Sequence, residues 1–446
     1  MRILLISTYD LGRQPFGLAS PAAWLRAEGH EVRCADLAVE PFPLEDAASA
    51  DVVAFFLPMH TATRLAAKAI RAVRTVNARA HLLAYGLYAV MNAGWLRQLG
   101  VESVFGGEFE GELVRYVRAL ASGEGREDGG CVVSVERLGF RVPDRSGLPP
   151  LERYAALCLN GTRRRVGYTE ASRGCKHLCR HCPVVPVYGG AFRVVPPEVV
   201  LEDIRRQVAA GAEHITFGDP DFFNGPSHAV RLVEAVHREF PALTYDVTIK
   251  VEHLRRRRDL LPVLKQTGCL FVTTAVESVE DEVLRKLDKG HTREDFLAVV
   301  EEFRRLGLTL APTFVPFTPW TTRDGYRDLL RLLVELDLVD AVAPIQLALR
   351  LLIPHGSRLL ELEEVRRTVG PFDETTLSYP WRHRDTGLDE LNRRLLSLVA
   401  QQERRGASRR ETFAAIWRET CDEPLPENFD LVARAAVPYL TEPWYC

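Results

Sequence analysis

The feature that most constrains the fold is a repeated alternation of short apolar runs with amphipathic stretches of helical period. Residues 2–7 form an apolar run suited to a buried parallel strand, and an amphipathic stretch from Ser20 to Glu28 ends at Gly29. The same unit recurs up to about residue 120, which predicts a Rossmann-like, doubly wound parallel sheet over residues 1–120. Ligands of such sheets bind at the C-terminal ends of the strands.

A second β/α series follows a Gly- and Pro-containing stretch, residues 121–164, which is predicted to be a linker. Residues 165–365 are predicted to form an incomplete (β/α)6 barrel of the TIM type, with its chemistry at the C-terminal mouth. Residues 366–446 are predicted to be a helical segment that ends in an extended, cysteine-containing tail. The six candidate barrel strands are Val166–Ala171, His214–Gly218, Tyr245–Lys250, Leu270–Glu277, Leu308–Pro316 and Ala341–Leu352.

Composition excludes several classes of protein. Of the 446 residues, 46% are apolar and 26% charged, and the net charge is -3, which is typical of a globular chain without a strongly basic nucleic-acid surface. No apolar run reaches the roughly 18 residues of a membrane span, and the N-terminus lacks the pattern of a signal peptide. We therefore expect a cytoplasmic protein without a membrane partner. In that reducing compartment, clustered cysteines indicate metal or redox chemistry.

Three cysteines, Cys175, Cys179 and Cys182, lie within eight residues in a CxxxCxxC spacing, directly after the first predicted barrel strand. Three thiolates on one short loop can face a single centre. One interpretation is a zinc site completed by His177 or His181, although the sequence has no second CxxC or HxxxH stretch. The interpretation that we favour is a [4Fe-4S] cluster whose remaining iron is open to a substrate.

This spacing resembles the signature of the radical S-adenosylmethionine (SAM) superfamily, in which the open iron binds the amino and carboxylate groups of SAM and delivers one electron to its sulfonium. The resemblance implies an enzyme, of transferase type, that cleaves SAM reductively and modifies a small-molecule substrate by radical chemistry. It also implies a cytoplasmic one-electron donor such as flavodoxin or ferredoxin. The only dense basic run, Arg255–Arg258, is short, so a nucleic-acid substrate is not expected.

Segments after two later strands supply the cofactor contacts that the resemblance implies. Gly218 and Asp219 stand where the superfamily's glycine-rich segment holds the methionine amino group, while Asp221 and Asn224 are candidates for substrate contacts. In the block TAVES, which ends at Ser278, Glu277 and Ser278 would reach the ribose hydroxyls or the carboxylate of SAM. A structural alternative is that Ser278 caps a helix that begins near residue 279.

Lys250, Gln346 and Arg350 lie near the ends of the third and sixth candidate strands. A buried lysine or arginine needs an anionic partner, and the carboxylate of SAM would supply one. Salt bridges between the barrel and its helices are the alternative interpretation.

The N-terminal region resembles the cobalamin-binding-type domain of some radical SAM enzymes, notably in Gly17–Val32 and Gly106–Glu112, and Asp281–Thr292 resembles a block of the same enzymes. The chain lacks the DxHxxG stretch that would supply a histidine to cobalt. Two alternatives therefore remain: the domain binds cobalamin without a histidine ligand, or it binds no cobalamin. Cobalamin-dependent radical methyl transfer is accordingly one alternative function.

The tail contains a second resemblance. Thr420-Cys-Asp-Glu-Pro424 is similar to the motif of the CUAEP/CCAEP-tail radical SAM proteins, although Thr420 and Asp422 depart from it. One hypothesis makes Cys421 and Cys446 catalytic, with a thiolate presented to a soft atom such as trivalent arsenic. Transfer of a 3-amino-3-carboxypropyl radical from SAM to that atom is the other alternative function. Hydrogen-atom donation or a disulfide relay, and a purely structural tail, are further interpretations.

Overall fold

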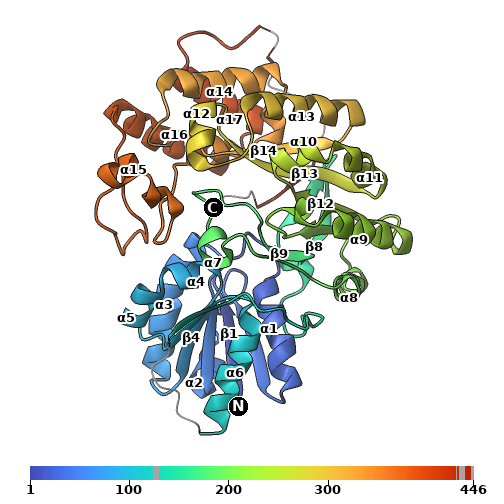
Figure 1. Cartoon of the computed structure of the whole chain (residues 1–446), viewed down its shortest axis with the longest axis vertical. Helices are drawn as coiled ribbons and strands as arrows, with labels where there is room; N and C mark the ends of the chain where they lie inside the picture. The colour runs from blue at the N-terminus through green and yellow to red at the C-terminus, as the bar shows by residue number, and fades with distance from the viewer. Residues whose placement is uncertain (124–129, 428, 431–436, 443–446) are drawn as a thin grey trace.

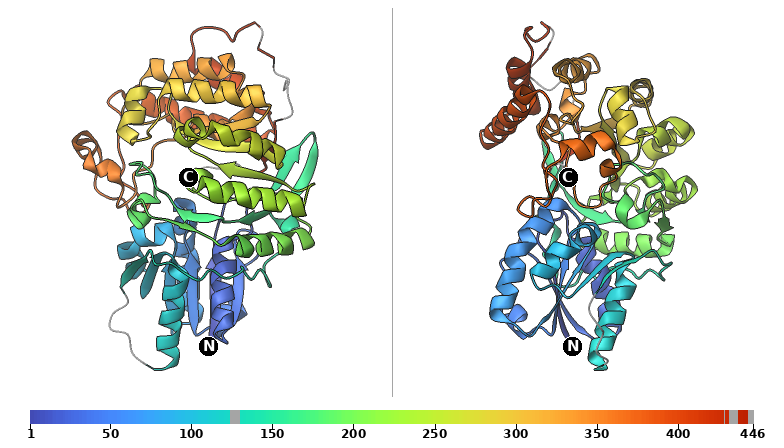
Figure 2. Two further views of the ribbon diagram at one scale, coloured as in Figure 1. Left: turned by 45° about the vertical axis from the view of Figure 1, so that its right-hand side comes forward. Right: turned by 60° about the vertical axis from the view of Figure 1, so that its left-hand side comes forward.

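The computed structural model of the protein describes residues 1–123, 130–427, 429–430 and 437–442. Two α/β units follow one another along the long axis of the molecule (Figure 1). The segment after β8, drawn in green, lies between the two sheets in the views of Figure 2. The junction between the units is therefore formed by the part of the chain that carries the CxxxCxxC sequence.

The first unit is a six-stranded parallel sheet in the order β2-β1-β3-β4-β5-β6. Its strands are apolar runs because helices cover both faces, α2 and α3 on one and α1 and α6 on the other. The order reverses between β1 and β3, so the expected doubly wound fold is confirmed. The strands are β1 Arg2–Ser7, β2 Glu31–Asp36, β3 Val52–Phe56, β4 His81–Tyr85, β5 Ser103–Gly107 and β6 Cys131–Ser134; the helices are α1 Phe16–Ala27, α2 Leu44–Ser49, α3 His60–Val76, α4 Leu87–Met91, α5 Ala93–Gln98 and α6 Phe109–Ala121.

Part of the predicted linker is regular structure. Strand β6 joins the first sheet beside β5, and β7, Ala156–Leu159, forms an antiparallel hairpin with β8. The four-residue β6 was not expected because so short an apolar run, next to a glycine pair, is typical of a turn. The domain boundaries given above stay predictions.

The second unit is a curled sheet in the order β14-β13-β12-β11-β8-β7-β15. Within the described residues, β8 to β14 provide five parallel strands, and β7 and β15 extend the β8 edge in antiparallel pairing. This curled sheet confirms the partial TIM-type barrel. Its elements are β8 Thr162–Thr169, α8 Pro197–Ala209, β11 His214–Phe217, α9 Pro226–Glu239, β12 Thr244–Thr248, α10 Val251–Arg256, α11 Leu261–Gln266, β13 Cys269–Glu277, α12 Asp281–Leu287, α13 Arg293–Leu306, β14 Thr309–Phe314 and α14 Arg323–Glu335.

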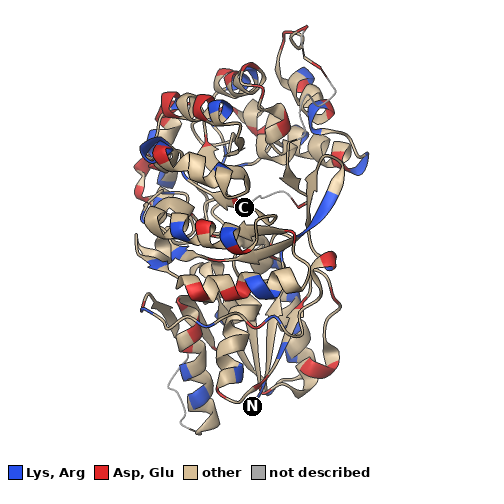
Figure 3. Ribbon diagram, turned by 90° about the vertical axis from the view of Figure 1, so that its right-hand side faces the viewer, with Lys and Arg blue, Asp and Glu red and all other residues tan. Residues whose placement is uncertain are grey.

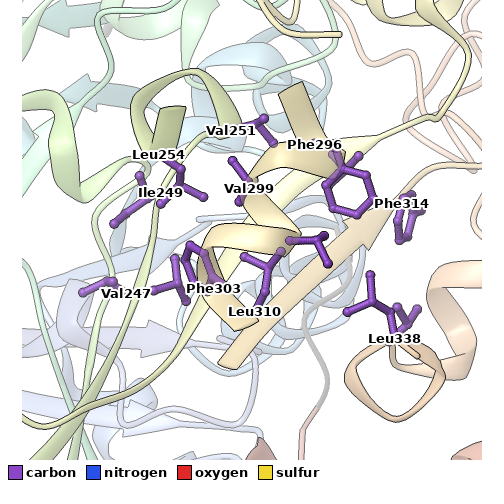
Figure 4. Close-up of a cluster of buried hydrophobic side chains, with 14 of the residues drawn as sticks. Val247, Ile249, Val251, Leu254, Phe296, Val299, Phe303, Leu310, Phe314 and Leu338 are labelled. Carbon is purple, nitrogen blue, oxygen red and sulfur yellow. The ribbon is translucent and has the colours of Figure 1, made fainter. Parts of the chain in front are cut away.

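The barrel's main core lies between the outer face of the sheet and the surrounding helices. Figure 4 shows this core where Phe296 and Phe303 of α13 meet Leu310 and Phe314 of β14. The apolar residues of α13 recur at helical spacing and bury one face of the helix, and a capping box at Thr292 fixes its start. Helix packing of this kind holds the strand ends in place at the mouth.

The expected sixth strand, Ala341–Leu352, is not a strand. The chain instead forms short 3-10 turns, one of them Pro344–Leu347, and continues the sheet only by a single parallel bridge between Phe317 and Arg350. Pro344 explains the difference, because proline lacks the N–H that a central strand must donate to its neighbour. Within the described residues the barrel therefore has five parallel strands instead of the six that we expected.

The remaining helices and the tail complete the second unit. Helices α15 Glu363–Thr368, α16 Thr386–Arg404 and α17 Arg409–Thr420 follow the barrel, which agrees with the expected helical segment. The tail then runs back to the barrel edge as β15, Tyr439–Leu440, which pairs with β7. Acidic and basic residues are interspersed along the outer helices (Figure 3). Among the described residues, no helix has both the length and the apolar character needed to cross a membrane.

Candidate functional site

The CxxxCxxC loop lies between two short elements, β9 Ser172–Gly174 and α7 Val185–Tyr188, and follows β8. Cys175 and Cys179 are buried and Cys182 is partly buried. Burial raises the pKa of Cys175, and burial together with the neighbouring Cys179 raises the pKa of Cys182 to about 12. Buried thiols that resist losing a proton to water are stabilised as thiolates by metal coordination, so this donor set fits a metal centre.

The geometry of the loop favours an iron–sulfur cluster over zinc. In the described structure, the sulfurs of Cys175, Cys179 and Cys182 do not all lie within 4.8 Å of one another. Zinc with bonds of about 2.3 Å would draw tetrahedral sulfur ligands to within about 4 Å. The two candidate fourth ligands also face other groups: His181 Nε2 lies 3.1 Å from Glu277 Oε1, and His177 Nε2 lies 3.5 Å from Asp221 Oδ2.

Two buried lysines face the cysteines. Lys250 Nζ lies 3.6 Å from Cys179 Sγ and 3.5 Å from Glu252 Oε2. Lys289 is 2% exposed and binds Glu277. Burial alone would lower the pKa of Lys289, but the negative charges of Glu277, Cys179 and Cys182 outweigh burial, so the pKa is raised. Lys250 is a residue that the sequence pattern predicts at the site, and the structure brings it to the cysteines. Lys289 was missed because it lies on a loop after α12, where strand alternation gives no signal.

Glu277 ends β13 at an irregularity in the pairing with β14 and has a φ of +67°. Its carboxylate is buried between Lys289 Nζ at 3.3 Å and His181 Nε2 at 3.1 Å. Burial alone would raise the pKa of Glu277, but these two cations hold it at about 2. Glu277 is therefore an ionised carboxylate directly behind the cysteine loop, and its expected contact with SAM stays a prediction.

Ser278 does not cap a helix near residue 279. Helix α12 begins at Asp281 with Glu280 as its N-cap, and the Ser278 hydroxyl accepts a hydrogen bond from the Glu280 N–H at 3.1 Å. That local turn satisfies Ser278 two residues before the helix. The alternative N-cap interpretation was wrong, and the ligand contact remains a prediction.

Gly218 and Asp219 follow β11, in the turn that leads to α9 and contacts the start of the cysteine loop. A Cβ atom at Gly218 would lie 1.7 Å from the Tyr168 hydroxyl, so the position has no room for a side chain. The Asp219 carboxylate accepts hydrogen bonds from the Ala171 N–H, at 2.9 Å, and from the Ser172 hydroxyl. Burial raises the pKa of Asp219 to about 7. Both residues hold the loop in place, and their contact with SAM stays a prediction.

The following residues of the same loop brace the cysteines. Asn224 Oδ1 accepts a hydrogen bond from the Lys176 N–H at 3.2 Å, and its backbone carbonyl accepts one from Lys176 Nζ at 2.6 Å. Asp221 is fully buried, and its Oδ1 accepts a hydrogen bond from the Phe223 N–H. These contacts tie the end of β11 to the cysteine loop, whereas the substrate contacts expected for Asp221 and Asn224 stay predictions.

Gln346 and Arg350 make contacts within the protein. Gln346 Oε1 accepts a hydrogen bond from the Phe314 N–H at 3.1 Å, at the end of β14. The Arg350 guanidinium binds Asp389 Oδ1 of α16 at 2.6 Å and lies 3.5 Å from the centre of the Trp381 ring. Arg350 thus follows the alternative interpretation, a salt bridge between the barrel and a helix. These contacts do not favour the SAM contacts predicted for either residue.

Of the two tail cysteines, only Cys421 lies within the described residues. Cys421 caps α17, is 9% exposed and belongs to the main hydrophobic core. Burial raises its pKa to about 11, so its sulfur is a protonated thiol in ordinary conditions. This position does not favour the predicted catalytic role. Cys446 lies outside the described residues, and its role stays a prediction.

The first unit contacts the cysteine loop directly. Arg173, 7% exposed, binds Glu110 at 2.7 Å and Glu108 at 3.2 Å, at the C-terminal end of β5. Helix α7 packs on α4 and β5, and Val187 lies 3.5 Å from where a Cβ of Gly106 would stand. The end of β1 is covered by the tail, because the Tyr9 hydroxyl donates a hydrogen bond to Glu442.

These contacts are relevant to cobalamin binding, because a doubly wound sheet binds its ligands at the C-terminal ends of its strands. The chain's own side chains pack on this edge: a Cβ at Gly17 would lie 2.2 Å from the Phe56 ring, and Tyr85 hydrogen-bonds the Gly17 carbonyl. These contacts fill part of that edge, and cobalamin bound without a histidine ligand stays one of the two alternatives.

The fold and the three-cysteine mouth define a class of iron–sulfur α/β-barrel enzymes. Residues 169–333 match the Radical SAM superfamily. This part of the chain is therefore similar to radical SAM enzymes, which use a [4Fe-4S] cluster and SAM, and the curated relatives are transferase-like enzymes.

Relatives agree with this assignment. The chain is 26% identical over 334 residues to the hopanoid C-3 methylase of Methylococcus capsulatus, covering 71% of this chain and 64% of that protein. It is 23% identical over 189 residues to the ribosomal protein uS12 methylthiotransferase RimO of Parabacteroides distasonis, covering 39% of this chain and 42% of that protein. The chain thus spans less than two thirds of the length of both relatives.

Two solved structures share the fold. The cobalamin-dependent SAM radical enzyme OxsB with aqua-cobalamin bound has a TM-score of 0.67 at 14% identity, covering 88% of this chain and 66% of OxsB. The radical SAM methyltransferase TsrM from Kitasatospora setae, with cobalamin and a [4Fe-4S] cluster bound, has a TM-score of 0.59 at 17% identity, covering 75% and 70%. At these identities the likeness concerns the fold.

Proposed function

We propose that Cys175, Cys179 and Cys182 hold the [4Fe-4S] cluster and that the protein cleaves SAM at the barrel mouth to modify a small-molecule substrate. The observation that supports this most is the set of three cysteines on one buried loop, with two buried lysines facing them. When bound, the cluster supplies the single electron that breaks a carbon–sulfur bond of SAM.

The surrounding side chains set the charge of the site. Lys250 and Lys289 place two positive charges beside cysteines that carry negative charge when they bind metal. Glu277 is the anionic partner of Lys289 and also contacts His181, so the buried lysine is compensated without solvent. In this proposal Lys250, Glu277, Ser278 and the Gly218–Asp219 turn face SAM, and a cytoplasmic one-electron donor such as flavodoxin or ferredoxin supplies the electron.

Methyl transfer is one candidate for the specific reaction. It is supported by the similarity to the hopanoid C-3 methylase and by the fold shared with TsrM and OxsB. The packed edge of the first sheet argues against a cobalamin-dependent route, because Arg173, α7 and Glu442 cover the strand ends.

Transfer of a 3-amino-3-carboxypropyl group to a soft acceptor such as trivalent arsenic is the second candidate. The observation that favours it is the return of the tail to the junction of the two units. Thr441 N–H binds the Ala156 carbonyl at 2.9 Å, and Glu442 binds Tyr9 at the end of β1. The four residues that follow Glu442 end in Cys446, whose thiolate would be the ligand of the soft atom.

Product analysis separates these reactions. The protein is reconstituted anaerobically with iron and sulfide, reduced, and incubated with SAM. 5'-Deoxyadenosine indicates hydrogen abstraction, S-adenosylhomocysteine indicates methyl transfer, and methylthioadenosine indicates carboxypropyl transfer. A chain that binds no iron and sulfide, or a Cys175→Ala, Cys179→Ala, Cys182→Ala variant that retains both, would contradict the cluster assignment.

A further inference from the structure

A second group of potential metal ligands lies beside the cysteine loop. It consists of His177 from the loop, Asp221 from the turn after β11, and His253 from α10. Asp221 Oδ2 lies 2.7 Å from His253 Nδ1 and 3.5 Å from His177 Nε2. One ligand atom from each residue lies within 4.8 Å of the other two. Two imidazoles and a carboxylate converging in this way form a common set of transition-metal ligands.

The three ligand atoms are buried and lack directed hydrogen bonds. His177 Nε2, Asp221 Oδ2 and His253 Nδ1 are each shielded from solvent, and none has a hydrogen bond of acceptable geometry in the described structure. The Asp221 side chain is fully buried, so its Oδ2 has no access to water and faces the two imidazoles. Buried polar atoms without partners are rare, and a bound ion is one established explanation.

Neighbouring groups already orient these ligands. Glu252 Oε2 lies 3.4 Å from His177 Nδ1, which directs His177 Nε2 toward Asp221. The Phe223 N–H binds Asp221 Oδ1 and leaves Oδ2 for the site. A carboxylate behind a ligating histidine and a backbone donor behind a ligating carboxylate are the usual supports of protein metal sites.

The group is separate from the cluster cysteines. Lys250 Nζ stands between Cys179 Sγ, at 3.6 Å, and Glu252 Oε2, at 3.5 Å. This positive charge lies between the sulfur ligands and the carboxylate that orients His177. His177, although it is part of the CxxxCxxC sequence, directs its ring toward Asp221 and His253, whose ring centre is 4.7 Å away.

We propose that His177, Asp221 and His253 bind one divalent transition-metal ion, zinc or ferrous iron, next to the [4Fe-4S] cluster. Three protein ligands leave a coordination position for water or for a donor atom of the substrate. The ion would also link the cysteine loop, β11 and α10.

The test uses the full chain, reconstituted anaerobically and freed of loosely bound metal with a weak chelator. Samples receive either Zn²⁺ or Fe²⁺, are desalted, and are analysed for zinc, iron and acid-labile sulfide. We expect one zinc per chain with an unchanged cluster spectrum, or iron in excess of sulfide by one per chain in the ferrous arm. His253→Ala and Asp221→Asn should lose that ion and keep the cluster, whereas His237→Ala, on α9, should keep both.

The same samples distinguish the two proposals of metal binding. A Cys175→Ala, Cys179→Ala, Cys182→Ala variant that loses iron and sulfide but still retains one zinc, lost again when His253→Ala is added, supports an independent site. If the wild-type chain retains no ion beyond the cluster in either arm, or if His253→Ala and Asp221→Asn retain as much as the wild type, the inference is overturned. In that case the contacts of Asp221 with the two histidines account for the geometry without an ion, and the cluster assignment is unaffected.

Discussion

Arg173 binds Glu110 with two hydrogen bonds, of 2.7 and 2.9 Å, across the junction between the two α/β units. Both side chains are buried, and Arg173 stands two residues before Cys175 on the loop that we assign to the cluster. The position of that loop is therefore fixed by the first unit as well as by the barrel.

Removing this guanidinium should destabilise the protein, because Glu108 and Glu110 would be left buried without their cation. Arg173→Met is expected to lower the free energy of unfolding by about 3–5 kcal/mol and to reduce cluster retention. Chemical denaturation and iron content measure the two effects. The matched control is Arg205→Met, which removes an exposed pair with Glu239 and should leave the stability nearly unchanged. Equal effects of both substitutions would contradict the role of the junction.

The cysteine loop was predictable because its signal is local. Cys175, Cys179 and Cys182 need only their spacing in the sequence to indicate a shared centre. The barrel was predictable for a similar reason, since apolar periodicity reports each strand and helix separately. These signals were sufficient for the class of fold and for the position of the mouth.

The contacts that complete the site join residues far apart in the sequence. Asp221 meets His253, and Arg173 meets Glu110, only because the strands place them side by side. The strand prediction was also wrong around Arg350. Pro344 interrupts the expected strand, so the side chains there do not alternate between the two faces of the sheet. Arg350 forms a salt bridge to Asp389 of α16, and its contact with SAM stays a prediction.

Lys250 provides a test of how the charge beside the cysteines affects the cluster. Lys250→Met removes a positive charge 3.6 Å from Cys179 Sγ and should make the cluster harder to reduce, which lowers its midpoint potential. Activity should fall by about 10- to 100-fold, as is common for groups that support metal ligands. Spectroelectrochemical titration measures the potential. Lys265→Met, on α11, is the control, and an unchanged potential in Lys250→Met would contradict this role.

Glu277 should make stability depend on pH. Its pKa is about 2 in the folded protein, below the ordinary value of 4.5, so its ion pairs contribute fully above about pH 4.5. That contribution, roughly 3 kcal/mol from the shift, is lost as the pH falls toward 2. Denaturation of the wild type and of Glu277→Gln should therefore show a gap in stability at pH 6 that narrows in acid. If the difference in stability between the wild type and Glu277→Gln stays constant from pH 6 into acid, the ion pairs of Glu277 are not the cause of that difference.

Gly218 should tolerate no side chain. Gly218→Ala places a methyl group 1.7 Å from the present position of the Tyr168 hydroxyl, so either β8 or the turn after β11 must shift. Because that turn carries Asp219 and Asn224, which hold the cysteine loop, we expect a loss of about 1–3 kcal/mol in stability together with weaker cluster binding. Gly94→Ala, where a Cβ meets no atom within 4 Å, is the control and should leave both unchanged. Thermal unfolding and iron content, measured on the same preparations, test this. If Gly218→Ala matches the wild type in both, then the turn does not depend on the close approach of Tyr168.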